Sequence, residues 1–264
     1  MKLQASTTPR YMAPLVLLLS LALVASVAAS PLPNGATLAT RIFNDCPTSI
    51  LSTTNSYPAL IQVDDQNLSC GGFANLHNWS FSDDGGATPA VFNNGDSFTF
   101  GADFEVTGGG EGGLRVSPWW SPDVDGRFNV RSTDGEVACF GGRLPFYSFG
   151  LLYTAGGVIH LEIAYDASLL SPSSPATIEY TVVYGASTYS SGPLPFDQGN
   201  PLEGYGSYGM LDQARVGGYV QGFLQGGNTA AGVTATWTDI TYTDMGTIAI
   251  EASSFGRLKA LYQQ

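Results

Sequence analysis

The amino-acid sequence predicts an all-β protein built as one antiparallel sandwich or barrel. Apolar and polar residues alternate with a period of two over many short segments, which is the pattern of strands with one buried face. The chain contains 33 Gly and 15 Pro, and turn dipeptides separate these segments. Many short strands at close spacing are typical of sandwiches and barrels. Since no repeat or linker is apparent, we expect a signal segment (1–29), one β domain (30–244) and a C-terminal tail (245–264).

The N-terminal segment has the composition of an export signal. Lys2 and Arg10 make its start basic, residues 12–27 carry no charge, and small residues lead up to Ala29. These three features are what a signal peptide requires. A membrane anchor is the alternative, but the apolar run is shorter than the roughly 20 residues that span a bilayer. We therefore expect cleavage before Ser30 and a secreted or surface-displayed mature protein without a membrane span.

Two segments show the strand pattern most clearly, Ser97–Val106 and His160–Asp166. Their apolar side chains share one face because neighbouring side chains of a strand point in opposite directions. Ile178–Tyr184 and Thr234–Tyr242 are further β-rich runs, and the second contains Trp237. The first two segments supply the predicted core residues Phe98, Phe100, Phe104, Leu161, Ile163 and Tyr165.

Turn dipeptides lie between these strands. Asparagine or aspartate followed by glycine, and paired glycines, favour the positive φ angles of hairpin turns. The run Gly108–Gly110 also predicts a hairpin turn, because no helical pattern follows it. The predicted hairpin dipeptides are Asn94-Gly95, Asp125-Gly126, Asp134-Gly135 and Gly156-Gly157.

The charge balance is strongly acidic. The formal net charge is -12, and removal of Lys2 and Arg10 with the signal leaves 8 basic against 22 acidic residues. Such a surface repels phosphate backbones, so we expect no nucleic-acid partner. Acidity favours solubility and is also compatible with divalent cations.

Three cysteines follow the signal segment, namely Cys46, Cys70 and Cys139. In an oxidising compartment we expect two of them to form a disulfide and the third to remain a thiol. The sequence leaves the choice of pair open. No C-x-x-C pair is present, so zinc and thioredoxin-type chemistry are not indicated.

Several segments together resemble a known superfamily. Trp79–Gly86, Phe98–Val106, Gly113–Trp120 and Trp237–Tyr242 resemble strands of the concanavalin A-like lectin/glucanase superfamily, including its laminin G-like jelly rolls. Residues 123–142 are similar to a group of exported bacterial proteins of unassigned function. The resemblance implies a jelly-roll sandwich of two antiparallel sheets. Members of the superfamily bind glycans, cleave glycans or mediate adhesion, so the fold alone does not settle function.

Exposed aromatic rings are the first candidate ligand contacts, because sugars stack on flat apolar surfaces beside fixed polar groups. Trp119 and Trp120 are adjacent and flanked by prolines, and Tyr205 and Tyr208 lie in a second glycine-rich stretch. The alternative is that these four rings cover the ends of the sandwich as part of its core.

Asp103 and Glu105 are the nearest approach to a catalytic pair, since both carboxylates share one face of a strand. Retaining glycosidases need two carboxyl groups about 5–5.5 Å apart. However, the E-x-D-x-E pattern of such enzymes, the G-x-S-x-G elbow and the H-E-x-x-H zinc motif are all absent. A polar outer face is the simpler interpretation, so we expect binding without catalysis.

Asp123, Asp125 and Asn129 form a candidate calcium site, because hard cations take several oxygen ligands. The alternative is an ordinary Asp-Gly turn. The first hypothesis is therefore a non-catalytic binding or adhesion domain whose partner is a glycan or a cell-surface protein. A glycoside hydrolase acting on polysaccharide and a purely structural surface protein are the alternatives.

Overall fold

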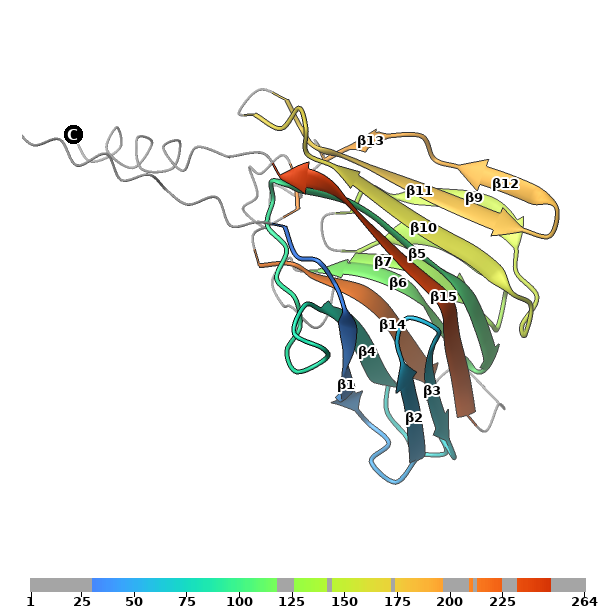
Figure 1. The fold of residues 1–264 in the computed structure, drawn as a ribbon. Helices are drawn as coiled ribbons and strands as arrows, with labels where there is room; N and C mark the ends of the chain where they lie inside the picture. The colour runs from blue at the N-terminus through green and yellow to red at the C-terminus, as the bar shows by residue number, and fades with distance from the viewer. Residues whose placement is uncertain are drawn as a thin grey trace, which may run out of the picture.

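A computed structural model shows two antiparallel β-sheets packed face to face (Figure 1). This confirms the predicted all-β, two-sheet sandwich. No helix among the described residues is long and apolar enough to cross a membrane. The structure describes residues 30–117, 126–141, 144–171, 174–196, 209–210, 213–224 and 232–247.

Sheet A has seven strands and sheet B has eight. In spatial order, sheet A contains β1 (Gly35–Asn44), β4 (Ala74–Ser82), β14 (Arg215–Phe223), β6 (Gly110–Ser117), β7 (Gly126–Arg131), β8 (Glu136–Phe140) and β9 (Tyr147–Leu152). Sheet B contains β12 (Ser187–Ser190), β11 (Thr177–Tyr184), β10 (Ile159–Asp166), β5 (Asp96–Gly108), β15 (Gly232–Thr247), β3 (Leu60–Gln66) and β2 (Ile50–Ser56), and β13 (Leu194–Pro195) pairs with β11. The chain crosses repeatedly from one sheet to the other, as in a jelly roll.

The core lies between the two sheets and contains every predicted core residue. The six residues expected from the alternating pattern on β5 and β10 are fully buried. Strand pairing places Phe100 opposite Ile163 of β10 and opposite Tyr242 of β15. Trp237 of β15 is also buried, and its indole N–H donates a hydrogen bond to the Gly113 carbonyl at 3.0 Å. The core therefore joins strands that lie far apart in sequence.

The glycine turns differ from the prediction in what they connect. Asp134-Gly135 closes the β7–β8 hairpin, with Gly135 at φ +78°, as expected. The run Gly108–Gly110 is not a hairpin turn, because it joins β5 of sheet B to β6 of sheet A. At Gly108, φ is +81°, and a Cβ would collide with the Gly232 carbonyl oxygen. The hairpin prediction is also wrong for Gly156-Gly157 and Asn94-Gly95, because each lies in a connection from sheet A to sheet B. Turn residues favour a local backbone conformation, but they do not determine which strand pairs with which.

The expected disulfide forms between Cys46 and Cys70, and Cys139 is a buried free thiol. The bond ties the β1–β2 connection to the β3–β4 connection. Burial raises the pKa of Cys139 well above its ordinary value, which suppresses the reactive thiolate. The domain therefore contains one disulfide, between Cys46 and Cys70, and one thiol, Cys139, which burial protects from reaction.

Thiol titration should therefore give two different counts. Native protein is expected to react slowly or not at all with a thiol reagent, and denatured, unreduced protein should titrate one thiol per chain. Three thiols after denaturation would contradict the disulfide. None would mean that Cys139 forms a bridge between chains.

Candidate functional site

The outer face of sheet A, opposite the core, carries an unusual set of polar side chains. On β6, Leu114 and Val116 enter the core, so Glu111 and Arg115 point to the other face. Strand register then aligns side chains into rows across β14, β6 and β7, such as Gln221, Glu111 and Arg131. We call this set the polar face: Glu111, Arg115, Arg127, Asn129, Arg131, Tyr219 and Gln221.

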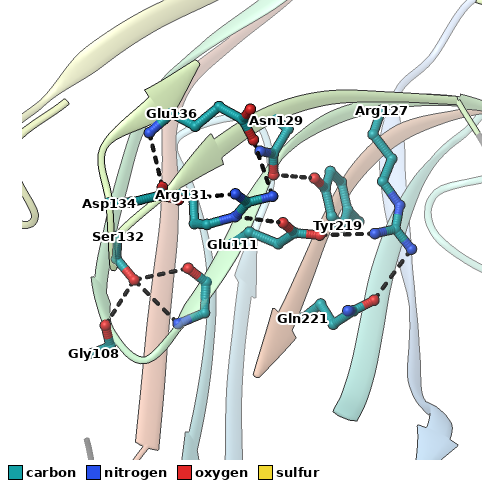
Figure 2. A network of polar contacts seen from close by, with 11 residues as sticks. Gly108, Glu111, Arg127, Asn129, Arg131, Ser132, Asp134, Glu136, Tyr219 and Gln221 are labelled. Atoms are coloured by element: carbon teal, nitrogen blue, oxygen red, sulfur yellow. Dashed lines mark hydrogen bonds and ion pairs between the residues drawn. The ribbon is translucent and has the colours of Figure 1, made fainter. Parts of the chain in front are cut away.

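Glu111 is the centre of an ion-pair network on the polar face (Figure 2). Its Oε1 lies 2.8 Å from Arg127 Nη1, and its Oε2 lies 3.2 Å from Arg131 Nε. Arg131 also contacts Asp134 and Glu136, each at 3.0 Å. The Glu111 side chain is 5% exposed, whereas those of Arg127 and Arg131 are 16% and 25% exposed. One buried carboxylate thus orients two partly exposed guanidinium groups.

The pKa shifts in this network favour its charged state. Partial burial opposes the charge of Arg131, but the hydrogen bond to Asp134 and the charges of Glu111, Asp134 and Glu136 raise its pKa overall. Burial also opposes the charge of Asp134, yet the Glu136 N–H and the Arg131 guanidinium lower its pKa. Because the pKa of Asp134 is depressed, its stabilising contribution is present at neutral pH and is lost as the pH falls through its folded-state value.

Tyr219 and Asn129 form a second polar pair beside this network. The Tyr219 hydroxyl donates to Asn129 Oδ1 at 2.7 Å, and the Arg127 guanidinium carbon lies 4.9 Å from the Tyr219 ring centroid. Burial raises the pKa of Tyr219 well above its ordinary value, so the hydroxyl remains a donor. Among the described residues, Asn129 Nδ2 has no hydrogen-bond partner although Asn129 is fully buried. Gly113 occupies the register position between Tyr219 and Asn129 and adds no side chain there.

A pocket of about 320 Å³ adjoins the polar face at β8 and β9. Asp134 and Glu136, the two exposed partners of Arg131, belong to its lining. Its remaining lining residues are Val137, Ser148, Gly150, Leu151 and Leu152. The pocket therefore reaches solvent next to the most exposed guanidinium of the network.

Arginine is concentrated on this side of the molecule. Residues 30–247 contain six arginines and no lysine, namely Arg41, Arg115, Arg127, Arg131, Arg143 and Arg215. Four of the six lie at outward-facing register positions of sheet A: Arg115 on β6, Arg127 and Arg131 on β7, and Arg215 on β14, next to the polar face. In a chain with net charge -12, this places most of the positive charge of the domain on one sheet face.

The predicted aromatic ligand contacts lie outside the described residues. Trp119 and Trp120 belong to segment 118–125, and Tyr205 and Tyr208 belong to segment 197–208. Segment 118–125 connects β6 to β7, two strands of the polar face. Its attachment point, Ser117, pairs with the first residue of β14.

Two of the three predicted calcium ligands, Asp123 and Asp125, also lie outside the described residues. The third, Asn129, is buried and accepts the Tyr219 hydrogen bond described above. Within the part of the chain that the structure describes, no group of three His, Cys, Asp or Glu residues is placed to hold a metal ion.

The alternative catalytic pair lies on the other side of the molecule. Asp103 and Glu105 are on the outer face of sheet B, where Asp103 Oδ1 lies 2.8 Å from His160 Nδ1. The strand register pairs His160 of β10 with Asp103 of β5. The second histidine, His77, is fully buried, and its Nε2 lies 3.1 Å from Asp65 Oδ2. His77 is therefore part of the interior.

Apart from Asn129, a candidate calcium ligand, the residues of the polar face were not predicted from the sequence, although a pattern that indicates them is present. Arg127, Asn129 and Arg131 alternate with Phe128 and Val130, which is the pattern of a half-buried strand with a charged outer face. Tyr219 and Gln221 show the same spacing. The sequence pattern alone does not distinguish these residues from polar residues on the outer face of any strand. Their location on neighbouring strands of one sheet is what makes them a site.

Comparison with known proteins gives structural similarity alone. No protein family and no curated protein matches the sequence. A marine PL-14 alginate lyase from Aplysia kurodai is 11% identical with a TM-score of 0.41, over 74% of this chain and 87% of the lyase. A Lotus tetragonolobus seed lectin is 10% identical with a TM-score of 0.43, over 81% and 96% of the two chains. Lectin II from Ulex europaeus is 11% identical with a TM-score of 0.38, over 81% and 96%. Similarities this low carry no argument about activity or ligand.

Proposed function

We propose that this protein is an exported glycan-binding domain, and that the polar face of sheet A is its binding site. The observation that carries the proposal is the placement of four of the six arginines of an acidic domain on one sheet face. Guanidinium groups match planar carboxylates through two parallel hydrogen bonds. The proposed ligand is therefore a glycan that carries carboxylate groups.

The geometry of the polar face supports this choice. Arg127 and Arg131 are its partly exposed members, and Glu111 holds both in fixed orientations. Binding to preoriented groups loses less side-chain entropy than binding to free ones. The adjoining pocket has a volume within the range of ligand sites.

The remaining sequence predictions fit into this proposal. In the proposal, Trp119, Trp120, Tyr205 and Tyr208 would supply stacking surfaces for the glycan, and Asp123 and Asp125 would shape the rim or hold calcium. Export agrees with the Cys46–Cys70 bond, because disulfides persist in oxidising compartments.

A glycoside hydrolase using Asp103 and Glu105 is the second candidate function. The observation that favours it is the 2.8 Å contact between Asp103 and His160, since a carboxylate and an imidazole in contact can transfer protons. The two candidates place the ligand on opposite faces of the sandwich, so substitutions on the two sheets distinguish them.

Acidic oligosaccharides should be retained by the exported protein more strongly than neutral ones of equal length. Arg127→Lys keeps the charge but removes the planar pair of donors, so we expect about tenfold weaker binding, equivalent to about 1.4 kcal/mol. The measurement is a glycan array with and without calcium, followed by titration of the retained glycan.

Asp103→Asn on sheet B serves as the matched control and should leave retention unchanged. Equal retention of acidic and neutral glycans would contradict the proposed ligand class. Loss of binding in Asp103→Asn with normal binding in Arg127→Lys would move the site to sheet B.

A further inference from the structure

The two ends of the sandwich domain meet at a buried carboxylate. Asp96, the first residue of β5, is 1% exposed. Its Oδ1 accepts hydrogen bonds from Ser30 Oγ at 3.3 Å and from Thr247 Oγ1 at 3.0 Å. Its Oδ2 accepts the Asn93 N–H at 2.7 Å. The hydroxyl groups of Ser30 and Thr247, which open and close the described domain, also contact each other.

The carboxylate of Asp96 has neutral partners. The three groups that donate to it are two hydroxyls and one backbone amide, and none of the ion pairs among the described residues includes it. A charge that is removed from water is costly unless an opposite charge is nearby. Asp96 therefore lies at a position where a cation would stabilise the fold.

Ser30, one of the donors to Asp96, is also the first residue of the mature chain that signal cleavage is predicted to leave. Hydrolysis of the Ala29–Ser30 peptide bond by a signal peptidase consumes one water and leaves a carboxylate on Ala29 and an ammonium group on Ser30. Within one serine the nitrogen and Oγ are about 3–4 Å apart. Because Ser30 Oγ contacts Asp96 at 3.3 Å, the new ammonium group would form within about 7 Å of the buried carboxylate. Cleavage frees the nitrogen from the preceding residue, so rotation within Ser30 can bring it to the carboxylate.

We propose that signal cleavage at this position creates an ion pair between the α-ammonium group of Ser30 and Asp96. The pair fastens the start of the domain to β5, and the Thr247 contact extends the connection to the end of β15. The unprocessed chain lacks this ammonium group, so processing itself stabilises the mature fold. The proposal is independent of the glycan site, because Asp96 belongs to sheet B and is not part of the polar face.

The test begins with N-terminal sequencing of the exported protein, which should start at Ser30. Two proteins that both end at Gln264 are then compared, one starting at Ser30 and the other retaining Ala29. The retained residue moves the ammonium group away from Asp96, so the midpoint of thermal unfolding should fall by at least about 4 °C. The same comparison is made in Asp96→Asn, which keeps the size of the side chain but removes its charge.

In Asp96→Asn, retention of Ala29 should leave the midpoint unchanged, because no ion pair remains to be lost. Asp83→Asn is the matched control: it removes an exposed carboxylate close to the first strand and should preserve the full difference between the two starts. An equal loss in the Asp96→Asn background would show a steric effect and overturn the proposal. Equal midpoints with Asp96 intact, or an exported protein that starts elsewhere, would also overturn it.

Discussion

Replacing Phe100 with alanine should lower the free energy of unfolding by about 3–5 kcal/mol. The ring is fully buried between the sheets and packs edge-on against Phe81 at a centroid distance of 5.6 Å. Removal of the ring loses its transfer free energy and leaves a cavity, because strands paired on both sides of β5 restrict collapse. Denaturant unfolding, with the slope checked for constancy, measures the change.

The adjacent residue provides the control. Thr99 is partly exposed on the opposite face of β5, so Thr99→Ala should change stability by no more than about 0.5 kcal/mol. A loss below about 1 kcal/mol for Phe100→Ala would mean that the register of β5 is wrong. Comparable losses for both variants would indicate a general weakening of the strand and not the loss of a core ring.

Replacing Glu111 with glutamine should lower the free energy of unfolding by about 3 kcal/mol. The substitution keeps the size of the side chain but removes the charge that faces Arg127 and Arg131. Arg127 is then left without a carboxylate partner, whereas Arg131 keeps its ion pairs with Asp134 and Glu136. The main cost is therefore the uncompensated, largely buried charge of Arg127. Denaturant unfolding at neutral pH gives the measurement.

Glu136→Gln is the matched control, because Glu136 also pairs with Arg131 but is 43% exposed. Exposed ion pairs contribute little, so the expected change is at most about 1 kcal/mol. If both variants lose the same stability, Glu111 is not the centre of the network. If neither does, the network contributes nothing to folding.

The stability and binding predictions for the polar face are connected. Glu111 fixes the two guanidinium groups that we propose contact the glycan, so Glu111→Gln should weaken glycan retention as well as the fold. Arg127→Lys, in contrast, keeps the central ion pair possible and is expected to affect retention more than stability. Glu111→Gln therefore tests whether the orientation of the two arginines matters for binding, and Arg127→Lys tests whether the guanidinium group itself contacts the ligand.

The sequence by itself determined four of the strands, the core residues on two of them and the presence of a disulfide. Alternation on Ser97–Val106 identified which side chains face inward, because period-two geometry is a local property of an extended chain. Phe98, Phe100 and Phe104 are buried for this reason. Local chemistry also identified the Gly135 turn, since positive φ favours glycine wherever the turn lies.

Only the tertiary structure decided which strands became neighbours. Gly108 turns into the opposite sheet, Cys46 pairs with Cys70, and His160 meets Asp103, because each partner is set by long-range packing. The polar face has the same origin. Glu111, Arg131 and Gln221 come from three strands. Their side chains lie together because β14, late in the sequence, pairs between β4 and β6, and β6 pairs with β7. The alternation of apolar and polar residues predicts which face of a sheet a side chain occupies. Which strands lie next to it depends on contacts between residues that are distant in sequence.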